Sequence, residues 1–380
     1  MVRLTRAQQQ GRTRAAVLAA AGEEFTEQGY VEARVDRIAE RAELTRGAVY
    51  SNFPSKRALY LAVLVDMVER AAIAEIAPAS PASTGEALGA FARVWLERLP
   101  LADDTPAGGH LQLRSLSGVL DDEPVRTALT QVIRLEALLL ALVLESHRPL
   151  PTERARRVRL AELVLTLLNG SGGFAETAPG FGDPFDVARA CEHLAGIDFT
   201  DIWNPPHLPY VSAAQPSDDA WTPPTELPDQ LTGRRVDLGG DGVIAVLGTH
   251  RLAATEEAVR AARPGEQVTV IVVTSDPAEI GRLIRLRVDD LTGCLRRVFG
   301  VDAWPLLRLL LDYRGKVVSA IGLPDTGDAT ESAVRIENGR IVARAEGRGA
   351  AYAAAIADAS DTARPHETGD PVRFDPFNRH

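Results

Sequence analysis

Apolar residues recur at helical spacing along the first 200 residues of the chain. Val17, Ala21 and Phe25, for example, lie four residues apart and form one apolar face of a helix. The stretch 138–144 is apolar on every side, which predicts a helix buried in a core. The whole pattern predicts helices near residues 12–28, 35–42, 46–53, 57–76, 85–99, 110–121, 124–147, 152–170 and 184–195.

The pattern changes after residue 230, where short β-branched runs alternate with helical stretches. A hairpin is predicted over residues 332–345, because Asn338-Gly339 is a preferred pair for a type I′ turn. Alternating strands and helices are typical of an α/β domain. The predicted strands are residues 242–248, 267–274, 306–311 and 316–321, and the predicted helices are residues 253–262, 277–285 and 290–299.

Two segments show neither period. Residues 201–230 are dense in Pro, Asn, Ser and Asp, and proline favours extended backbone, so we expect a linker. The predicted fold class is multidomain, an all-α N-terminal region followed by an α/β domain. The expected parts are a helix-turn-helix domain at 1–57, a helical domain at 58–200, the linker at 201–230, the α/β domain at 231–358 and a flexible tail at 359–380.

Composition excludes several classes of protein. The 380 residues are 45% hydrophobic and 25% charged, which is ordinary for globular domains. No apolar run reaches the roughly 18 residues that a membrane span requires, and no signal peptide is apparent. The two cysteines, Cys191 and Cys294, cannot form a disulfide framework or a four-ligand zinc site. We therefore expect a cytoplasmic protein without membrane contact, metal or cofactor.

Charge is distributed unevenly along the chain. The net charge is −10, which taken alone argues against a nucleic-acid partner. Residues 1–60, however, hold ten basic and seven acidic residues, a net charge of +3 that leaves −13 for the other 320 residues. Charge counted by domain therefore permits a DNA-binding N-terminus.

Two short helices joined by a tight turn form a helix-turn-helix pattern, and Thr45 and Ser55 are placed to cap the helices that follow them. If Val49 and Phe53 pack inward, the opposite face meets the major groove. There, Arg46 suits guanine O6 and N7, whereas Tyr50 and Lys56 suit phosphates. The predicted DNA-contacting residues are Arg34, Val35, Thr45, Arg46, Gly47, Ala48, Tyr50, Ser51, Asn52 and Lys56. The alternative is three stabilising helices with a solvated basic face.

These residues closely resemble the TetR family of bacterial regulators. The resemblance lies in residues 25–30 (FTEQGY), 38–42 (IAERA), 44–50 (LTRGAVY) and 52–56 (NFPSK), followed by Leu59. Two positions depart from the family pattern. Ala33-Arg34 replaces a usual Thr pair, which removes a side-chain cap, and Arg34 is placed to reach a phosphate instead. Glu43 replaces a usual Gly, so we expect left-handed backbone there.

The resemblance implies that residues 58–200 bind an effector and form a homodimer. The last two helices, about 152–169 and 184–194, would pair with those of the partner subunit. Such a dimer fits a palindromic double-stranded DNA operator, and the implied role is a ligand-responsive repressor. The small-molecule effector is unknown. Candidate pocket residues are Trp95, Arg114, Glu136, His147 and Asn169, each of which has the alternative of an ordinary core or surface role.

The C-terminal pattern resembles a thioredoxin-like fold. Residues 301–305 (VDAWP), a leucine-rich strand and residues 312–316 (DYRGK) look like that family's cis-proline strand and hairpin. The position of its redox motif holds Thr249-His250-Arg251-Leu252 and no cysteine, so thiol chemistry has no nucleophile there. We expect no enzymatic activity. The alternatives are a DNA-binding module fused to a thiol-dependent redox enzyme or sensor, and an architectural DNA binder without a ligand.

Overall fold

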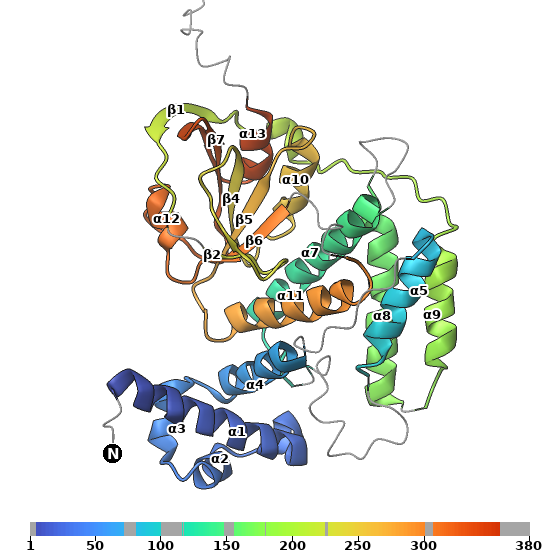
Figure 1. The fold of residues 1–380 in the computed structure, drawn as a ribbon, viewed down its shortest axis with the longest axis vertical. Helices are drawn as coiled ribbons and strands as arrows, with labels where there is room; N and C mark the ends of the chain where they lie inside the picture. Colours follow the sequence, from blue (N-terminus) through green and yellow to red (C-terminus); the bar gives the residue numbers. More distant parts are fainter. Residues whose placement is uncertain are drawn as a thin grey trace, which may run out of the picture.

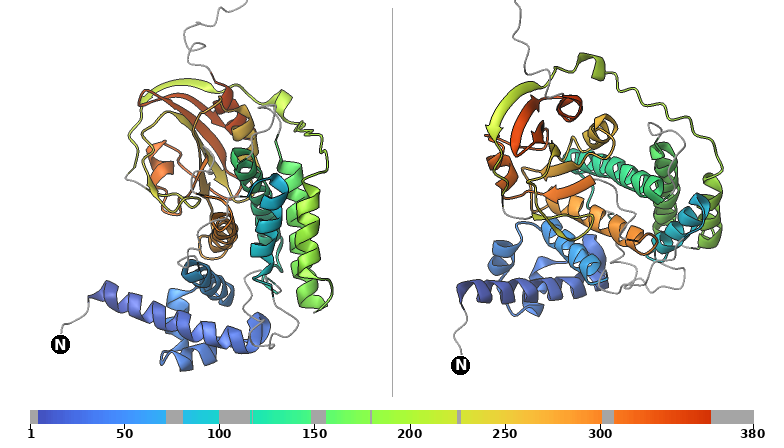
Figure 2. Two further views of the ribbon diagram at one scale, coloured as in Figure 1. Left: turned by 45° about the vertical axis from the view of Figure 1, so that its right-hand side comes forward. Right: turned by 45° about the horizontal axis from the view of Figure 1, so that its top comes forward.

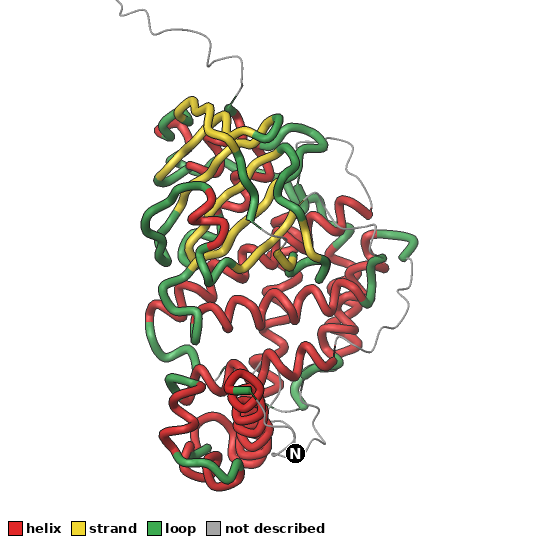
Figure 3. Tube along the Cα trace, turned by 60° about the vertical axis from the view of Figure 1, so that its left-hand side comes forward, coloured by secondary structure: helices red, strands yellow, loops and turns green. Residues whose placement is uncertain are grey.

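The computed structural model describes residues 5–71, 81–99, 116, 118–147, 156–178, 180–224, 227–300 and 307–357. Along the longest axis of the molecule, the first helices lie at one end and a β-sheet lies at the other (Figure 1). Helices fill the middle layer, and the separation of the helical and sheet regions is visible in Figure 3.

Four helices open the described chain: α1 (Arg6–Glu32), α2 (Val35–Arg41), α3 (Arg46–Asn52) and α4 (Lys56–Ala71). Helix α1 begins six residues before the predicted start, because Thr5 and Gln8 form a capping box. It also continues past Gly29, whose left-handed backbone (φ 70°) makes a kink where we predicted an end. The predicted caps are confirmed. Thr45 Oγ1 accepts from the Ala48 N–H, and Ser55 Oγ accepts from the Ala58 N–H.

The helical body contains α5 (Thr84–Leu96), α7 (Glu123–His147), α8 (Val158–Thr177) and α9 (Pro184–Leu194). Among the described helices, α7 is the one long and apolar enough to cross a membrane. The protein buries 67% of that stretch, as expected of a core helix. The predicted 110–121 helix lies mostly outside the described residues, and residues 118–121 are non-helical.

The sheet of the C-terminal domain has the strand order β1-β8-β7-β4-β5-β6. Strands β4, β5 and β6 are parallel, whereas β7 and β8 form an antiparallel hairpin beside β4. Asn338 (φ 51°) and Gly339 (φ 72°) give the hairpin the predicted I′-type turn. The strands are β1 (Gln215–Ala220), β4 (Gly242–Gly248), β5 (Val268–Val273), β6 (Leu307–Leu311), β7 (Glu331–Glu337) and β8 (Arg340–Glu346), with a separate pair β2 (Leu227–Pro228) and β3 (Arg235–Val236).

Helices cover both faces of the sheet. One face packs on α10 (Ala254–Ala261), α11 (Ile280–Arg296) and α13 (Ala350–Ile356), and its core is continuous with that of the helical body. The other face packs on α12 (Lys316–Ala320) and Trp221. This arrangement confirms the predicted α/β class. The thioredoxin-like resemblance stays a prediction, and its expected cis-proline segment, residues 301–306, lies outside the described residues.

Two element predictions in this domain are wrong. Residues 316–321 were expected to form a strand but make helix α12, because the Asp312 carboxylate accepts from the N–H groups of Lys316 and Val317 and so caps a helix. The two helices expected at 277–285 and 290–299 are one helix, α11, which is unbroken because the apolar spacing continues through Val288.

The predicted linker at 201–230 is also corrected. It carries the short 3-10 helix η1 (Leu208–Tyr210) and strand β1, which pairs with β8 at the edge of the sheet. Trp221 is buried and its Nε1–H donates to the Leu238 carbonyl at 2.7 Å. The chain leaves α9, crosses the outside of the helical body and returns to the sheet (Figure 2). Residues 215–221 are therefore part of the α/β domain.

Helix α11 lies between the sheet and the N-terminal helices, and it contacts α4, α7 and α5 (Figure 1). At this junction Arg287 of α11 bonds both carboxylate oxygens of Glu136 in α7, at 2.8 and 2.7 Å. Arg98 and Asp290 form a second ion pair across the same junction. The α/β domain is thus attached to the helical body by buried charged contacts as well as by apolar packing.

Candidate nucleic-acid interface

Helix α3 has one face in the core and one face in solvent. Val49 is 1% exposed, and Phe53, which ends the helix, is fully buried, so they fix α3 against α1 and α4. Thr45, Arg46 and Gly47 are exposed at the opening of the helix. The orientation predicted from the sequence is therefore confirmed.

The opening of α3 leaves the backbone accessible. A methyl group in place of the Gly47 hydrogen would have one non-neighbouring atom near it, the Thr45 hydroxyl oxygen at 3.9 Å. The Thr45 hydroxyl is engaged as the N-cap, which fixes the first turn of the helix. Because Gly47 and Ala48 are small, the first turn of α3 can come close to the edges of the bases.

Arg46 is held at the edge of this surface rather than folded away. Its guanidinium lies 5.5 Å from the centre of the Tyr50 ring and 3.4 Å from an Asp36 carboxylate oxygen, while the side chain stays 60% exposed. Contact with Tyr50 and the charge of Asp36 raise the pKa of Arg46. The side chain therefore carries its positive charge at any physiological pH and presents that charge at the surface.

Three of the other side chains predicted to contact DNA form hydrogen bonds within the protein. Ser51 Oγ and Asn52 Nδ2 both donate to the Ala48 carbonyl, each at 2.9 Å. Lys56 Nζ donates to the Val31 carbonyl at 2.8 Å and lies 5.0 Å from the Tyr30 ring centre. Burial lowers the pKa of Lys56.

The two ends of α2 hold the positions that depart from the family pattern. Glu43, in the turn after α2, has φ 54°, the left-handed backbone expected where the family usually has Gly. Arg34 is exposed at the N-cap of α2, where it makes no side-chain cap. The prediction that Val35 contacts DNA is corrected, because its side chain is buried in the domain core.

The four candidate effector residues that the structure describes are not brought together. Asn169 Nδ2 donates to the Leu165 carbonyl in its own helix, and the His147 ring packs on Phe299. Trp95 is fully buried beside Phe91. Glu136 forms the ion pair with Arg287, and Arg114 lies outside the described residues.

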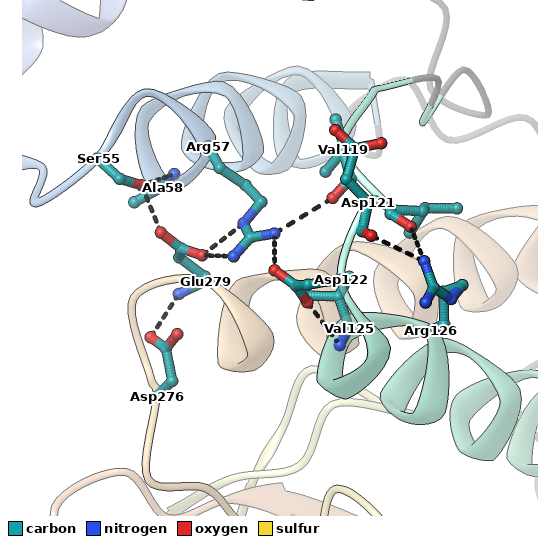
Figure 4. Close-up of polar contacts among 11 residues, drawn as sticks. Ser55, Arg57, Ala58, Val119, Asp121, Asp122, Val125, Arg126, Asp276 and Glu279 are labelled. Atoms are coloured by element: carbon teal, nitrogen blue, oxygen red, sulfur yellow. Dashed lines mark hydrogen bonds and ion pairs between the residues drawn. The ribbon is translucent and has the colours of Figure 1, made fainter.

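A polar cluster at the start of α4 was not predicted from the sequence (Figure 4). Glu279, at the start of α11, accepts hydrogen bonds from Ser55 and from Arg57 in α4. Arg57 also donates to Asp122 at 2.6 Å and to the Val119 carbonyl at 3.4 Å. The hydrogen bond from Arg57 lowers the pKa of Asp122. These groups lie far apart in the chain, so no local pattern joins them.

A second contact joins the α/β domain to Phe53, the residue that follows α3. The Phe53 ring lies between two guanidinium groups, with Arg14 at 4.5 Å and Arg282 at 5.5 Å from its centre. Arg282 also donates to the Ala58 carbonyl at 2.9 Å. Helix α11 therefore contacts both ends of the Phe53–Ser55 turn that sets the angle between α3 and α4.

The cysteines are placed as core residues. Both are fully buried, and burial raises the pKa of the Cys191 thiol to about 11. At the redox-motif position, the Thr249 hydroxyl donates to Asp328 at 2.7 Å. Within the described residues no group of three His, Cys, Asp or Glu side chains is arranged to hold a metal ion.

Comparison with known proteins identifies the N-terminal domain. Residues 17–63 match the model of the bacterial regulatory proteins of the tetR family, a span that contains α2, α3 and parts of α1 and α4. These residues therefore form a TetR-family helix-turn-helix domain. No curated protein matches the chain as a relative.

Solved structures of regulators resemble about half of the chain. A TetR transcriptional regulator from Rhodococcus sp. RHA1 is 21% identical with a TM-score of 0.33, covering 50% of this chain and 99% of that one. One from Chloroflexus aurantiacus J-10-fl is 24% identical with a TM-score of 0.35, covering 50% and 94%.

Proposed function

We propose that this protein is a DNA-binding transcriptional regulator that reads its operator with α3. The observation that carries the proposal is the exposed start of α3, Thr45–Gly47, which buried Val49 and Phe53 hold in place within a TetR-family domain. Arg46 hydrogen-bonds guanine, and the small residues Gly47 and Ala48 let the helix enter the major groove. Tyr50 and Lys56 contact phosphates and set the position of the helix.

The proposed reader acts as a homodimer through α8 and α9. Large apolar side chains gather there in solvent: Phe174 is 52%, Phe181 69% and Phe185 73% exposed, and the Phe174 and Phe181 rings lie 5.2 Å apart. An exposed aromatic patch of this kind marks an interaction surface. A second copy with the same patch satisfies it under two-fold symmetry, which presents two α3 helices to a palindromic operator.

The regulator responds to a small molecule and represses transcription in this proposal. An effector shifts the equilibrium only as far as it prefers one conformation, so it must favour the state in which the two α3 helices no longer fit successive major grooves. The α/β domain is a binding and docking module without catalysis, and the support is that both cysteines are buried away from solvent.

Footprinting tests the proposal. The purified protein is added to DNA from upstream of its own gene and of the neighbouring genes, and protection from nuclease cleavage is mapped. We expect protection over a site with two-fold sequence symmetry, whose half-site centres lie a whole number of helical turns apart. Protection that does not differ between these segments and unrelated DNA at any salt concentration would overturn the proposal.

A further inference from the structure

A cavity of about 370 Å³ lies between the helical body and the α/β domain. Its walls come from α7 and α8, from the segment that contains Trp203 and His207, and from the turn that leads from β4 into α10. The volume falls in the range of small-molecule sites. None of the five effector residues predicted from the sequence lines it.

Three side chains that line this cavity carry buried polar atoms without a hydrogen-bond partner. Among the described residues, His207 Nδ1, His250 Nε2 and Glu257 Oε2 have no hydrogen-bond partner. Glu257 is 9% exposed, and its other oxygen lies 3.0 Å from His207 Nε2. Buried polar groups in proteins are nearly always hydrogen-bonded, so three unpartnered groups around one cavity indicate a ligand that pairs with them.

Two of the neighbouring carboxylates are engaged by arginines. Arg251 binds Glu331 at 2.7 Å, and Glu256 binds Arg260 at 2.8 Å. Glu257 differs from them, because one of its oxygens has no hydrogen-bond partner among the described residues. Burial raises the pKa of Glu257.

The rest of the wall contains both charged and apolar side chains. The apolar part of the lining includes Leu135 and Leu138 of α7, Leu252 and Trp203. Gln131 in α7 accepts from the Ala253 N–H at 2.9 Å, a bond that joins the two domains at the rim. A ligand held here contacts both domains at once.

We propose that this interdomain cavity binds a compact amphipathic molecule whose amino or hydroxyl group donates a hydrogen bond to Glu257, with the imidazoles of His207 and His250 pairing with its other polar atoms. The apolar part of the molecule lies on Leu135, Leu138 and Leu252. The molecule is the effector if the proposed regulatory function holds; the binding site itself rests on the cavity alone.

The test uses three probes of matched size: 2-phenylethylamine, 2-phenylethanol and phenylacetate. Their binding to the full chain is measured by isothermal titration calorimetry in the absence of DNA. We expect saturable binding of the amine and the alcohol and at least ten-fold weaker binding of phenylacetate. Failure of both donor-bearing probes to bind, or equal binding of all three, overturns the proposal.

Variants locate the binding. Glu257→Leu removes the acceptor, and we expect it to weaken both donor-bearing probes at least ten-fold. Glu257→Gln keeps an acceptor oxygen, so the alcohol should bind within about three-fold of wild type while the amine weakens. His250→Leu, with thermal melting as the control for folding, gives a second reading if the Glu257 variants do not fold. Unchanged binding in the folded variants overturns the site.

The two proposals fail separately. DNA binding is measured on the same protein without any probe, so probes that bind a chain with no operator affinity leave the cavity standing and remove the regulatory function. Operator binding without binding of either donor-bearing probe has the opposite meaning and overturns the cavity assignment.

Discussion

Substitution of the buried Arg287–Glu136 ion pair tests most directly how strongly charged contacts join the helical body to the α/β domain. The two side chains are 6% and 1% exposed and form two hydrogen bonds. Arg287→Met keeps an apolar stem of similar length and removes the charge. It leaves the Glu136 carboxylate buried opposite a thioether.

Removing one partner of a buried ion pair costs about 3–5 kcal/mol, because the other charge stays buried after it loses that partner. Glu136 has the option of taking up a proton, which limits the loss, so we expect about 3 kcal/mol at neutral pH. The double variant Arg287→Met with Glu136→Leu replaces the pair by apolar groups, and we expect it within about 1 kcal/mol of wild type. The single variant Glu136→Leu completes the cycle. The coupling energy of the pair is the stability loss of the double variant minus the sum of the two single losses.

Urea unfolding, followed by tryptophan fluorescence, measures the four proteins of this cycle. The matched control is Arg285→Met, which breaks an ion pair with Glu69 of α4 and an i,i+4 pair with Asp289. Arg285 and Glu69 are nearly half exposed, so the loss should not exceed about 1 kcal/mol. The reasoning is refuted if Arg287→Met costs no more than Arg285→Met, or if the double variant is as unstable as the single one.

Three further outcomes follow from the structure. Thr45→Ala removes the cap on the Ala48 N–H and should lower the free energy of unfolding by about 1 kcal/mol, whereas Thr45→Ser should retain it, as thermal melting will show. Phe185→Glu should shift the protein from dimer to monomer in sedimentation velocity; an unchanged dimer would move the interface elsewhere. Burial raises the pKa of Asp289 to about 6, above its unfolded value, so the folded state binds the proton more tightly and stability falls as pH rises from about 4 to 6. Asp289→Asn should therefore be more stable than wild type by about 2 kcal/mol at pH 7.5, and this gain should vanish below pH 4 in urea titrations; a gain that does not change with pH contradicts the assignment.

Local patterns were sufficient for the reader and for the middle of the sheet. Cap residues and helical spacing placed α2, α3 and the start of α4, and a continuous apolar run marked β4. The Asn338-Gly339 turn placed the hairpin. In each of these cases the determining contacts lie within a few residues of one another, so a short window of sequence contains them.

Long-range contacts decided the elements and sites that the sequence did not reveal. Strand β1 is polar and exposed, and its backbone pairs with β8 more than 120 residues later, so no period marks it. From the sequence, Glu136 was predicted to line an effector pocket. It instead pairs with Arg287, which is 151 residues away in the chain. The cavity joins His207 to Glu257 and His250 across the domain junction. The local sequence marked only one part of this site, the polar pair His250-Arg251 shortly after the buried strand β4.

The central claim is that α3 reads base sequence while its surroundings hold the DNA backbone. Fluorescence anisotropy with the footprinted operator and with a random duplex, at several salt concentrations, tests it in wild type, Arg46→Ala, Lys56→Ala and the exposed control Arg314→Ala. Arg46→Ala should lose about 1–3 kcal/mol on the operator and little on random DNA. Lys56→Ala should weaken both duplexes and lower the salt slope by about 1, and the control should match wild type. If Arg46→Ala and Lys56→Ala both bind operator and random DNA as wild type does, α3 is not the reader.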